Sequence, residues 1–374
     1  MFEEFHAKVT ALSPEQSGFV HVVDSEPALT EGPLSDLLIP IKDLMPVSGM
    51  PTTYGSVHRT VFEPSDPFVN ELVRKGARIV GKTATSELGM MAYTEPVGMP
   101  AVDNPLWPGH TPGGSSGGAA VAVARGLVEV AHASDGGGSI RVPAAACGVV
   151  GFKPVHDNRG GKLTVQGFIT QSVAMQARMH GVQLTPRPLR IGVLLEPLHG
   201  DGTVTTEWVA ACQEAATALS DLGHDVVEVA PAYDASYFQA FETMLSGMCR
   251  KIDGEASEIV SWLRGKGQAL SAEERAVAVD KCASLGAVVR GAWDIDVLLT
   301  PTLAFDPPKI GHFSALSPRE DFDEQTRWTP WCTLFNITGW AGISIPFGGR
   351  SVHLGAIRCS EGELLGLAEE LHGS

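Results

Sequence analysis

The sequence has no excess of positive charge, no long apolar run and no closely spaced cysteines. Its 27 Lys and Arg residues are outnumbered by 43 Asp and Glu residues, which gives a formal net charge of −16. A negative field of this size disfavours nucleic acid and anionic membranes as partners. No uninterrupted apolar run reaches about 18 residues, so no membrane-spanning helix is expected. The N-terminus lacks the basic segment and apolar core of a signal peptide.

The six cysteines are scattered singly, and none forms a CxxC pair: Cys147, Cys212, Cys249, Cys282, Cys332 and Cys359. This spacing predicts reduced thiols in a cytoplasmic protein. The sequence also contains no HxH or HExxH pattern, so we expect neither a metal site nor a cofactor. Twelve histidines are present but no GxSxG elbow, and a Ser–His–Asp triad would therefore need a different geometry.

Two knots of glycine and serine are the most distinctive feature of the chain. They are GGSSGG at residues 113–118 and GGGS at residues 136–139. The sequence between them predicts a helix over 119–126 and a strand over 127–133. Glycine tolerates φ > 0, so such turns can direct several backbone N–H groups into one pocket. An oxyanion hole needs these donors beside a nucleophile, and Ser139, after three glycines, is the best candidate.

A lysine lies at the end of an apolar segment far upstream. Residues 33–42 contain LLIPIK and predict a strand that carries Lys42 to its end. Burial there would lower the pKa of the lysine and let its neutral amine accept a proton. The alternative is a surface lysine paired with Asp43. Spacing alone favours this alternative, whereas the two serine turns downstream favour a catalytic role.

The segments GGSSGG, SDGGGSIRVPA and CGVVGFKP, with PIKDL upstream, resemble the signature of the amidase signature family. These enzymes are serine hydrolases with a Ser–Ser–Lys triad. The resemblance extends over residues 18–185 and 190–374 and is strongest at 108–154. It implies that Ser139 is the nucleophile, Ser115 the serine of a cis peptide bond, and Lys42 the base that receives the proton through Ser115.

The resemblance also implies roles for the residues around the nucleophile. The oxyanion hole would be formed by the backbone N–H groups of Gly136, Gly137, Gly138 and Ser139. The family usually has an aliphatic residue where Gly136 stands, which predicts a looser turn here. Four further residues are expected to support the site. Ser116 and Ser134 would do so by hydrogen bonds, and Asp135 and Arg141 by a structural ion pair.

We predict one α/β domain over residues 1–374, with a mixed β-sheet flanked by helices on both sides. It would comprise a signature core (30–185), a C-terminal core (190–232 and 292–374) and a helical lobe (233–291) covering the cleft. Helix breaks are expected near Gly254 and at 265–267. The chain is identified as a shortened member, because a helical stretch before residue 190 and part of the N-terminal helical region are missing.

The resemblance implies an amidase that cleaves a carboxamide or related C–N acyl bond through acyl-Ser139. Linear amides are the expected substrates, and esters are chemically adjacent. The alternatives are an amidotransferase subunit that releases ammonia from glutamine, and an inactive scaffold. The expected partner is a small-molecule amide, and a homodimer is left open. Loops at 90–107, 155–185 and 305–340 should shape the pocket, whereas packing is the default interpretation for the nearby tryptophans: Trp328, Trp331 and Trp340.

Overall fold

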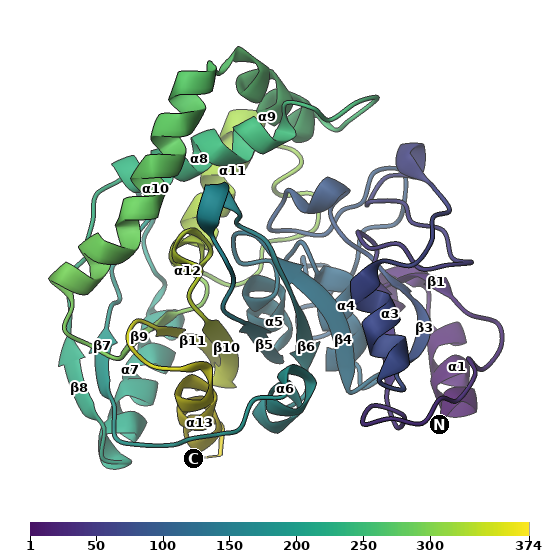
Figure 1. Ribbon diagram of the computed structural model, residues 1–374, viewed down its shortest axis with the longest axis horizontal. Helices are drawn as coiled ribbons and strands as arrows, with labels where there is room; N and C mark the ends of the chain where they lie inside the picture. The colour runs from purple at the N-terminus through teal and green to yellow at the C-terminus, as the bar shows by residue number, and fades with distance from the viewer. Residues whose placement is uncertain (374) are drawn as a thin grey trace.

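The computed structural model describes residues 1–373 and contains a large mixed sheet (Figure 1). Its strand order is β4-β6-β5-β10-β11-β9-β7-β8. β7 runs parallel to β8 and β9, and the other neighbours are antiparallel. The strands are β4 (Val130–Asp135), β5 (Val150–Lys153), β6 (Val165–Thr170), β7 (Arg190–Val193), β8 (Asp225–Glu228), β9 (Val297–Pro301), β10 (Gly342–Phe347) and β11 (Arg350–Ala356).

A second, three-stranded sheet has the order β1-β3-β2. It consists of β1 (Phe19–Val22), β2 (Leu38–Lys42) and β3 (Arg78–Thr83). The predicted mixed sheet is confirmed, but the first strands were not expected to form a sheet of their own. Apolar runs identify strands, whereas their partners depend on long-range packing that local patterns do not encode.

Helices cover both faces of the large sheet, as predicted. In β9, Val297 and Leu299 face a core shared with α6, α7 and α13, whereas Leu298 faces a core shared with α8, α10 and α12. This alternation is the period of two that a strand imposes on its side chains. The bounds are α6 (Val173–His180), α7 (Thr206–Asp221), α12 (Thr333–Thr338) and α13 (Glu361–His372).

The two glycine–serine knots lie at the ends of a buried helix–strand unit. Helix α4 (Gly117–Ala124) has seven buried residues among its eight, and β4 is buried along its whole length. The helix starts two residues before the predicted one, and the strand is displaced toward the second knot. Ser115 consequently precedes α4, and Ser139 lies between β4 and helix α5 (Arg141–Cys147).

The predicted helical lobe consists of α8 (Ser236–Cys249), α9 (Glu258–Ala269) and α10 (Ala272–Ala292), next to α11 (Pro318–Trp328) (Figure 1). The chain breaks near Gly254, as expected. The break predicted at 265–267 is wrong, because α9 continues to Ala269. A Cβ at Gly267 would lie 1.9 Å from the carbonyl oxygen of Ser246, so glycine allows α8 and α9 to pack closely. This packing outweighs the modest helix penalty of glycine.

The remaining helices lie near the small sheet at the N-terminal side (Figure 1). They are α1 (Phe2–Thr10), α2 (Pro14–Ser17) and α3 (Pro67–Arg74). Across residues 1–373, none of the helices combines the length and apolar character needed to cross a membrane.

Candidate active site

Lys42 ends β2 with its side chain completely buried. Its Nζ donates to Ser115 Oγ at 2.7 Å, to Ser134 Oγ at 3.1 Å and to the Ser134 carbonyl at 3.4 Å. Burial lowers the pKa of this lysine from 10.5 to about 7, although the negative charge of Asp135 opposes the shift. The amine can therefore exchange a proton near neutral pH.

The alternative interpretation of Lys42 as a surface residue paired with Asp43 is wrong. Asp43 is itself buried, and its Oδ1 accepts a hydrogen bond from Lys82 Nζ at 2.8 Å. The two neighbouring residues thus belong to separate polar clusters. Strand alternation explains the separation, because successive side chains point to opposite faces.

Three serines converge around the lysine. Ser115 follows a cis peptide bond after Gly114, the geometry that the family resemblance implied for this residue. Ser116 Oγ donates to the Ser134 carbonyl at 3.3 Å. The Ser116 backbone N–H donates to the Ser139 carbonyl at 3.3 Å, so the two knots are joined directly. All three serine side chains are buried or nearly so. The hydrogen bonds expected from Ser116 and Ser134 are therefore present.

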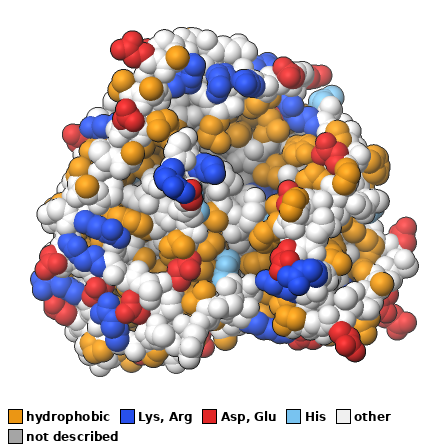
Figure 2. Space-filling view, viewed as in Figure 1, with side chains coloured by type: hydrophobic (Ala, Val, Ile, Leu, Met, Phe, Trp, Pro, Cys, Tyr) orange, Lys and Arg blue, Asp and Glu red, His pale blue; other side chains and the backbone are white. Residues whose placement is uncertain are grey.

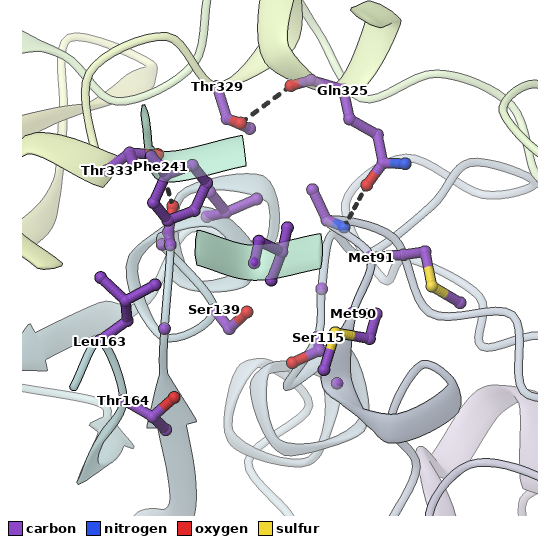
Figure 3. A pocket seen from close by; sticks show the side chains of 18 of the residues that line it. Met90, Met91, Ser115, Ser139, Leu163, Thr164, Phe241, Gln325, Thr329 and Thr333 are labelled. Atoms are coloured by element: carbon purple, nitrogen blue, oxygen red, sulfur yellow. Dashed lines mark hydrogen bonds between the residues drawn. The ribbon is translucent and has the colours of Figure 1, made fainter. Parts of the chain in front are cut away.

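Ser139 lies in the turn between β4 and α5, and its side chain is partly exposed toward a cavity. Figure 3 shows Ser139 and Ser115 projecting into the same space at the base of that cavity. Within residues 1–373, Ser139 Oγ makes no hydrogen bond, so the expected contact with Ser115 is not formed in this conformation. Such contacts often tighten only when substrate binds.

Asp135 and Arg141 brace the turn that carries Ser139, and the expected ion pair between them is present. Arg141 Nη2 and Nε lie 3.0 Å from the two carboxylate oxygens of Asp135, and both side chains are fully buried. The carboxylate also accepts the backbone N–H groups of Gly138 and Ile140. Burial alone would raise the pKa of Asp135, but the Arg141 charge and the hydrogen bonds hold it well below its usual range.

These contacts reduce the number of backbone N–H groups that could bind an oxyanion as predicted. The Gly138 N–H donates to Asp135 Oδ1 at 2.8 Å, so it is not free to bind an oxyanion. The N–H groups of Gly136, Gly137 and Ser139 have no acceptor within the described chain. A Cβ at Gly136 would lie 3.0 Å from Thr164 Oγ1, so Thr164 occupies the space beside this glycine.

Sequence reasoning missed the distant residues that complete this brace. Asn336 Nδ2 donates to Asp135 Oδ1 at 2.9 Å and to the carbonyls of Asp135 and Leu163. Arg141 in turn donates to Asn336 Oδ1, and His353 Nε2 lies 3.1 Å from Arg141 Nη1. An asparagine within the apolar stretch TLFNIT was the available signal, because a buried amide needs hydrogen-bond partners.

The cavity beside Ser139 has a volume of about 160 Å³ and contains no charged side chain in its lining. Figure 2 shows hydrophobic side chains around a hollow below the helical lobe. The apolar lining is Leu44, Leu88, Met90, Met91, Ala92, Val142, Leu163, Phe238, Phe241, Leu245, Met248 and Phe322. The polar side chains are Ser115, Ser134, Ser139, Thr164, Gln325, Thr326, Thr329 and Thr333.

Each of the three predicted loop regions contributes to this lining, but only in part. Residues 90–92, 163–164 and several positions between 322 and 333 reach the cavity. The expected packing of Trp328 and Trp331 is confirmed, because both are completely buried and donate to backbone carbonyls. Sequence reasoning did not identify the four α8 side chains of the lining, whose apolar pattern is that of any buried helix face.

No group of three or more His, Cys, Asp or Glu side chains in residues 1–373 is arranged to hold a metal ion. The site instead combines a buried amine, hydroxyl groups and free backbone N–H donors. These are the elements of nucleophilic acyl transfer.

Similarity to known proteins agrees with this chemistry. The amidase family model matches residues 21–162 and 166–357. AmiB2 of Mycobacterium tuberculosis is 32% identical over 382 residues, which cover 91% of this chain and 82% of AmiB2. The 6-aminohexanoate-cyclic-dimer hydrolase of Paenarthrobacter ureafaciens is 28% identical over 450 residues, covering 100% and 91% of the two chains.

Solved structures show the same fold. A 6-aminohexanoate cyclic dimer hydrolase complexed with substrate superposes with a TM-score of 0.88 at 25% identity, covering 99% of this chain and 92% of the hydrolase. One subunit of the glutamyl-tRNA(Gln) amidotransferase of Thermotoga maritima superposes with a TM-score of 0.77 at 22% identity, covering 98% and 89%. From the family match and these relatives, we conclude that the chain belongs to the amidase signature family of hydrolases.

Proposed function

We propose that the protein hydrolyses the C–N bond of a small, uncharged linear carboxamide through an acyl intermediate on Ser139. The observation that carries the proposal is the buried Lys42 amine, 2.7 Å from Ser115 Oγ, beneath an uncharged cavity into which Ser139 projects. A lysine with a pKa of about 7 can act as a base at neutral pH.

In the acylation step, Ser139 Oγ forms a bond to the substrate carbonyl carbon. Its proton passes to Ser115 Oγ, while the hydroxyl proton of Ser115 passes to the neutral amine of Lys42. The hydrogen bond between Lys42 and Ser115 supports this relay, because its direction can reverse once the amine is uncharged. When the C–N bond breaks, the proton returns through Ser115 to the leaving amine.

The developing oxyanion would accept the backbone N–H groups of Gly136, Gly137 and Ser139. These donors have no competing acceptor, so they are available where negative charge forms. The Asp135–Arg141 pair keeps the turn in this conformation.

In the deacylation step, water attacks the acyl carbon of acyl-Ser139 and gives its proton to the same relay. The Ser139 oxygen then leaves and recovers a proton from Ser115, which releases the carboxylic acid. An ester of the same acid would form the same intermediate, so esterase activity belongs to the proposal.

The uncharged lining supports a neutral substrate over glutamine. Free glutamine carries an α-ammonium and an α-carboxylate, and burying such charges without partners is strongly unfavourable. The relative named for the cyclic dimer of 6-aminohexanoate agrees with this preference, since a cyclic dimer has no free amino or carboxyl group. The amidotransferase function is therefore the less favoured alternative.

The volume of the cavity supports a compact acyl group. About 160 Å³ is close to the roughly 150 Å³ of an engineered apolar cavity that holds benzene. We therefore propose a benzoyl-sized or hexanoyl-sized acyl half, with the amine half outside the cavity. A linear amide meets this requirement more simply than a cyclic diamide.

Acyl transfer to hydroxylamine tests the proposal with benzamide, hexanamide and glutamine as substrates. Hydroxylamine competes with water for the acyl-enzyme, so we expect the hydroxamates of the two neutral amides from wild type. The Ser139→Ala variant should form none. Preferential formation of glutamyl hydroxamate would favour the amidotransferase function, and no product from any substrate with folded protein would favour the inactive scaffold.

A further inference from the structure

His132 lies where the two sheets meet. It is on β4, the edge strand of the large sheet, and it is 1% exposed. Its Nδ1 accepts the backbone N–H of Lys42 at 3.2 Å, across from β2 at the edge of the small sheet. Between β2 and β4, the described residues form no backbone–backbone hydrogen bond. The hydrogen bonds made directly between these two strands therefore involve side chains.

The second ring nitrogen of His132 fixes its orientation. Nε2 lies 3.0 Å from Gln166 Oε1 on the adjacent strand β6. Because Nδ1 accepts from Lys42, Nε2 carries the ring proton and donates it to Gln166. The rings of Phe68 and Phe168 lie 5.3 and 6.4 Å from the imidazole. The ring is thus held on two sides and along both nitrogens.

The charge state of His132 is consistent with an acceptor at Nδ1. Burial lowers the pKa of His132 to about 3, and the charges of Lys42 and Lys82 add to this shift. The imidazole consequently stays neutral throughout the range in which Lys42 titrates. His132 is also no substitute base, since neither ring nitrogen contacts Ser139 or Ser115.

The same strand holds both ends of Lys42. His132 and Ser134 are two positions apart on β4 and project from the same face. His132 accepts the backbone N–H of the lysine, and Ser134 Oγ accepts its Nζ at 3.1 Å. The Nζ also donates to the Ser134 carbonyl at 3.4 Å and to Ser115 Oγ at 2.7 Å.

Resting on the proposed function, we propose that His132 is a positioning residue for Lys42. Its imidazole sets how far the lysine backbone lies from the large sheet, and therefore where the amine meets Ser115. Lys42 ends a strand of the small sheet, whereas Ser139 follows β4 of the large sheet, so their alignment needs such a contact. A misplacement of about 1 Å in a relay of this kind can cost about 100-fold in rate.

Two amide substitutions at this position form a matched pair. In His132→Asn, the amide oxygen can take the place of Nδ1 and accept from the Lys42 N–H. In His132→Gln, the amide lies near the place of Nε2, where it can contact Gln166 but does not replace the acceptor to Lys42. Both variants are polar and uncharged, so they differ mainly in which histidine contact they retain.

The measurement is the second-order rate constant for labelling of Ser139 by a fluorophosphonate, followed by intact mass, with melting temperature recorded alongside. We expect His132→Asn to stay within about 5-fold of wild type and His132→Gln to lose about 100-fold, at similar melting temperatures. Equal rates in the two variants would overturn the inference, whether both are fast or both slow. Wild type that is not labelled at Ser139 would overturn the proposed function and this inference together.

Discussion

The Lys42–Ser115–Ser134 cluster and the α8–α11 side of the cavity differ in chemistry and in how they are held. Figure 3 shows Ser115 of the cluster and, across the cavity, Phe241, Gln325 and Thr329. In the cluster, three buried polar side chains are joined by hydrogen bonds within 3.1 Å. The opposite side is formed by Phe241 and other apolar side chains. Of its polar side chains, Thr326 and Thr329 donate to backbone carbonyls four residues earlier. Gln325 Oε1 accepts the Ala92 N–H, and Thr333 Oγ1 donates to the Gly137 carbonyl at 3.4 Å.

This difference assigns reactivity and selectivity to separate parts of the site. Hydrogen bonds are directional, so a small change in the cluster should alter the rate of the chemical step. Apolar contacts depend on volume and area, so a change in the α8 side should alter which acyl group binds. Substitutions in the two regions should consequently affect different kinetic parameters.

The largest effect should come from removing the base. We expect Lys42→Met to lower turnover by about 10⁴-fold, since removing one triad member disables the relay. The free energy of unfolding of Lys42→Met, in contrast, should be higher than that of wild type near and below neutral pH. Because burial lowers the pKa of Lys42 to about 7, wild type bears the cost of a buried charge at and below that pH.

A urea titration at several pH values measures this second effect. Between pH 7 and 10.5, Lys42 binds more protons in the unfolded state than in the native state. The contribution of Lys42 to the free energy of unfolding of wild type therefore rises with pH. The advantage of Lys42→Met should therefore be greatest at about pH 6 and disappear toward about pH 10. A variant that is less stable than wild type at about pH 6 would contradict the account of a desolvated lysine.

The next effect concerns the pH dependence of wild-type activity. Lys42 must be uncharged to accept a proton, so kcat/KM should fall about 10-fold per pH unit below about 7. A pH–rate profile between about 5 and 9 measures this limb. The midpoint of this limb should not reflect the pKa of His132, because that histidine is already neutral in this range. A profile that stays flat over this range would contradict the assignment of Lys42 as the base.

On the opposite side of the cavity, Phe241→Ala should change substrate choice by about 10- to 100-fold. The ring lies close to the nucleophile turn, since a Cβ at Gly137 would be 3.5 Å from Phe241 Cζ. We expect KM for benzamide to rise and kcat/KM for amides with longer acyl chains to increase. The pH profile should stay unchanged. Tyr237→Ala, on the same helix but outside the cavity lining, is the matched control.

If Phe241→Ala shifted the acid limb of the pH profile, the two regions would not be separable. If Tyr237→Ala changed acyl preference as strongly, the effect would reflect loosening of the lobe rather than cavity volume.

The smallest effect should be confined to the stability of the lobe. We expect Gly267→Ala to lower the free energy of unfolding by about 1–3 kcal/mol, because its Cβ would meet the Ser246 carbonyl at 1.9 Å. Gly265→Ala on the same helix meets nothing within 4 Å and should add about 0.5–1 kcal/mol. Denaturant unfolding measures both, and equal shifts would contradict the close packing of α8 and α9.

The sequence was most informative about groups that short motifs bring together. Ser115 and Ser139 lie in two glycine-rich turns separated by one helix and one strand, and Ser134 lies near the end of that strand, so local patterns predicted that they would converge. The apolar strand around Lys42 was not enough by itself, since spacing alone favoured a surface lysine paired with Asp43. The two serine turns downstream were needed to favour a catalytic role. The fold class followed from apolar periodicity and the resemblance together.

Contacts between distant segments were not predictable in the same way. Asn336 and His132 complete their networks through residues about 200 and 90 positions away. The separate small sheet depends on strand partners, and the uninterrupted α9 depends on a helix–helix contact at Gly267. These features are decided by tertiary packing, which can override local propensity.

The most direct test of the account is intact mass after incubation with a fluorophosphonate, on wild type and Ser139→Ala. The account predicts a single adduct on wild type and none on the variant, with both proteins folded. An adduct that persists in Ser139→Ala would identify a different nucleophile. Folded wild type that gains no mass would contradict the acyl-serine mechanism.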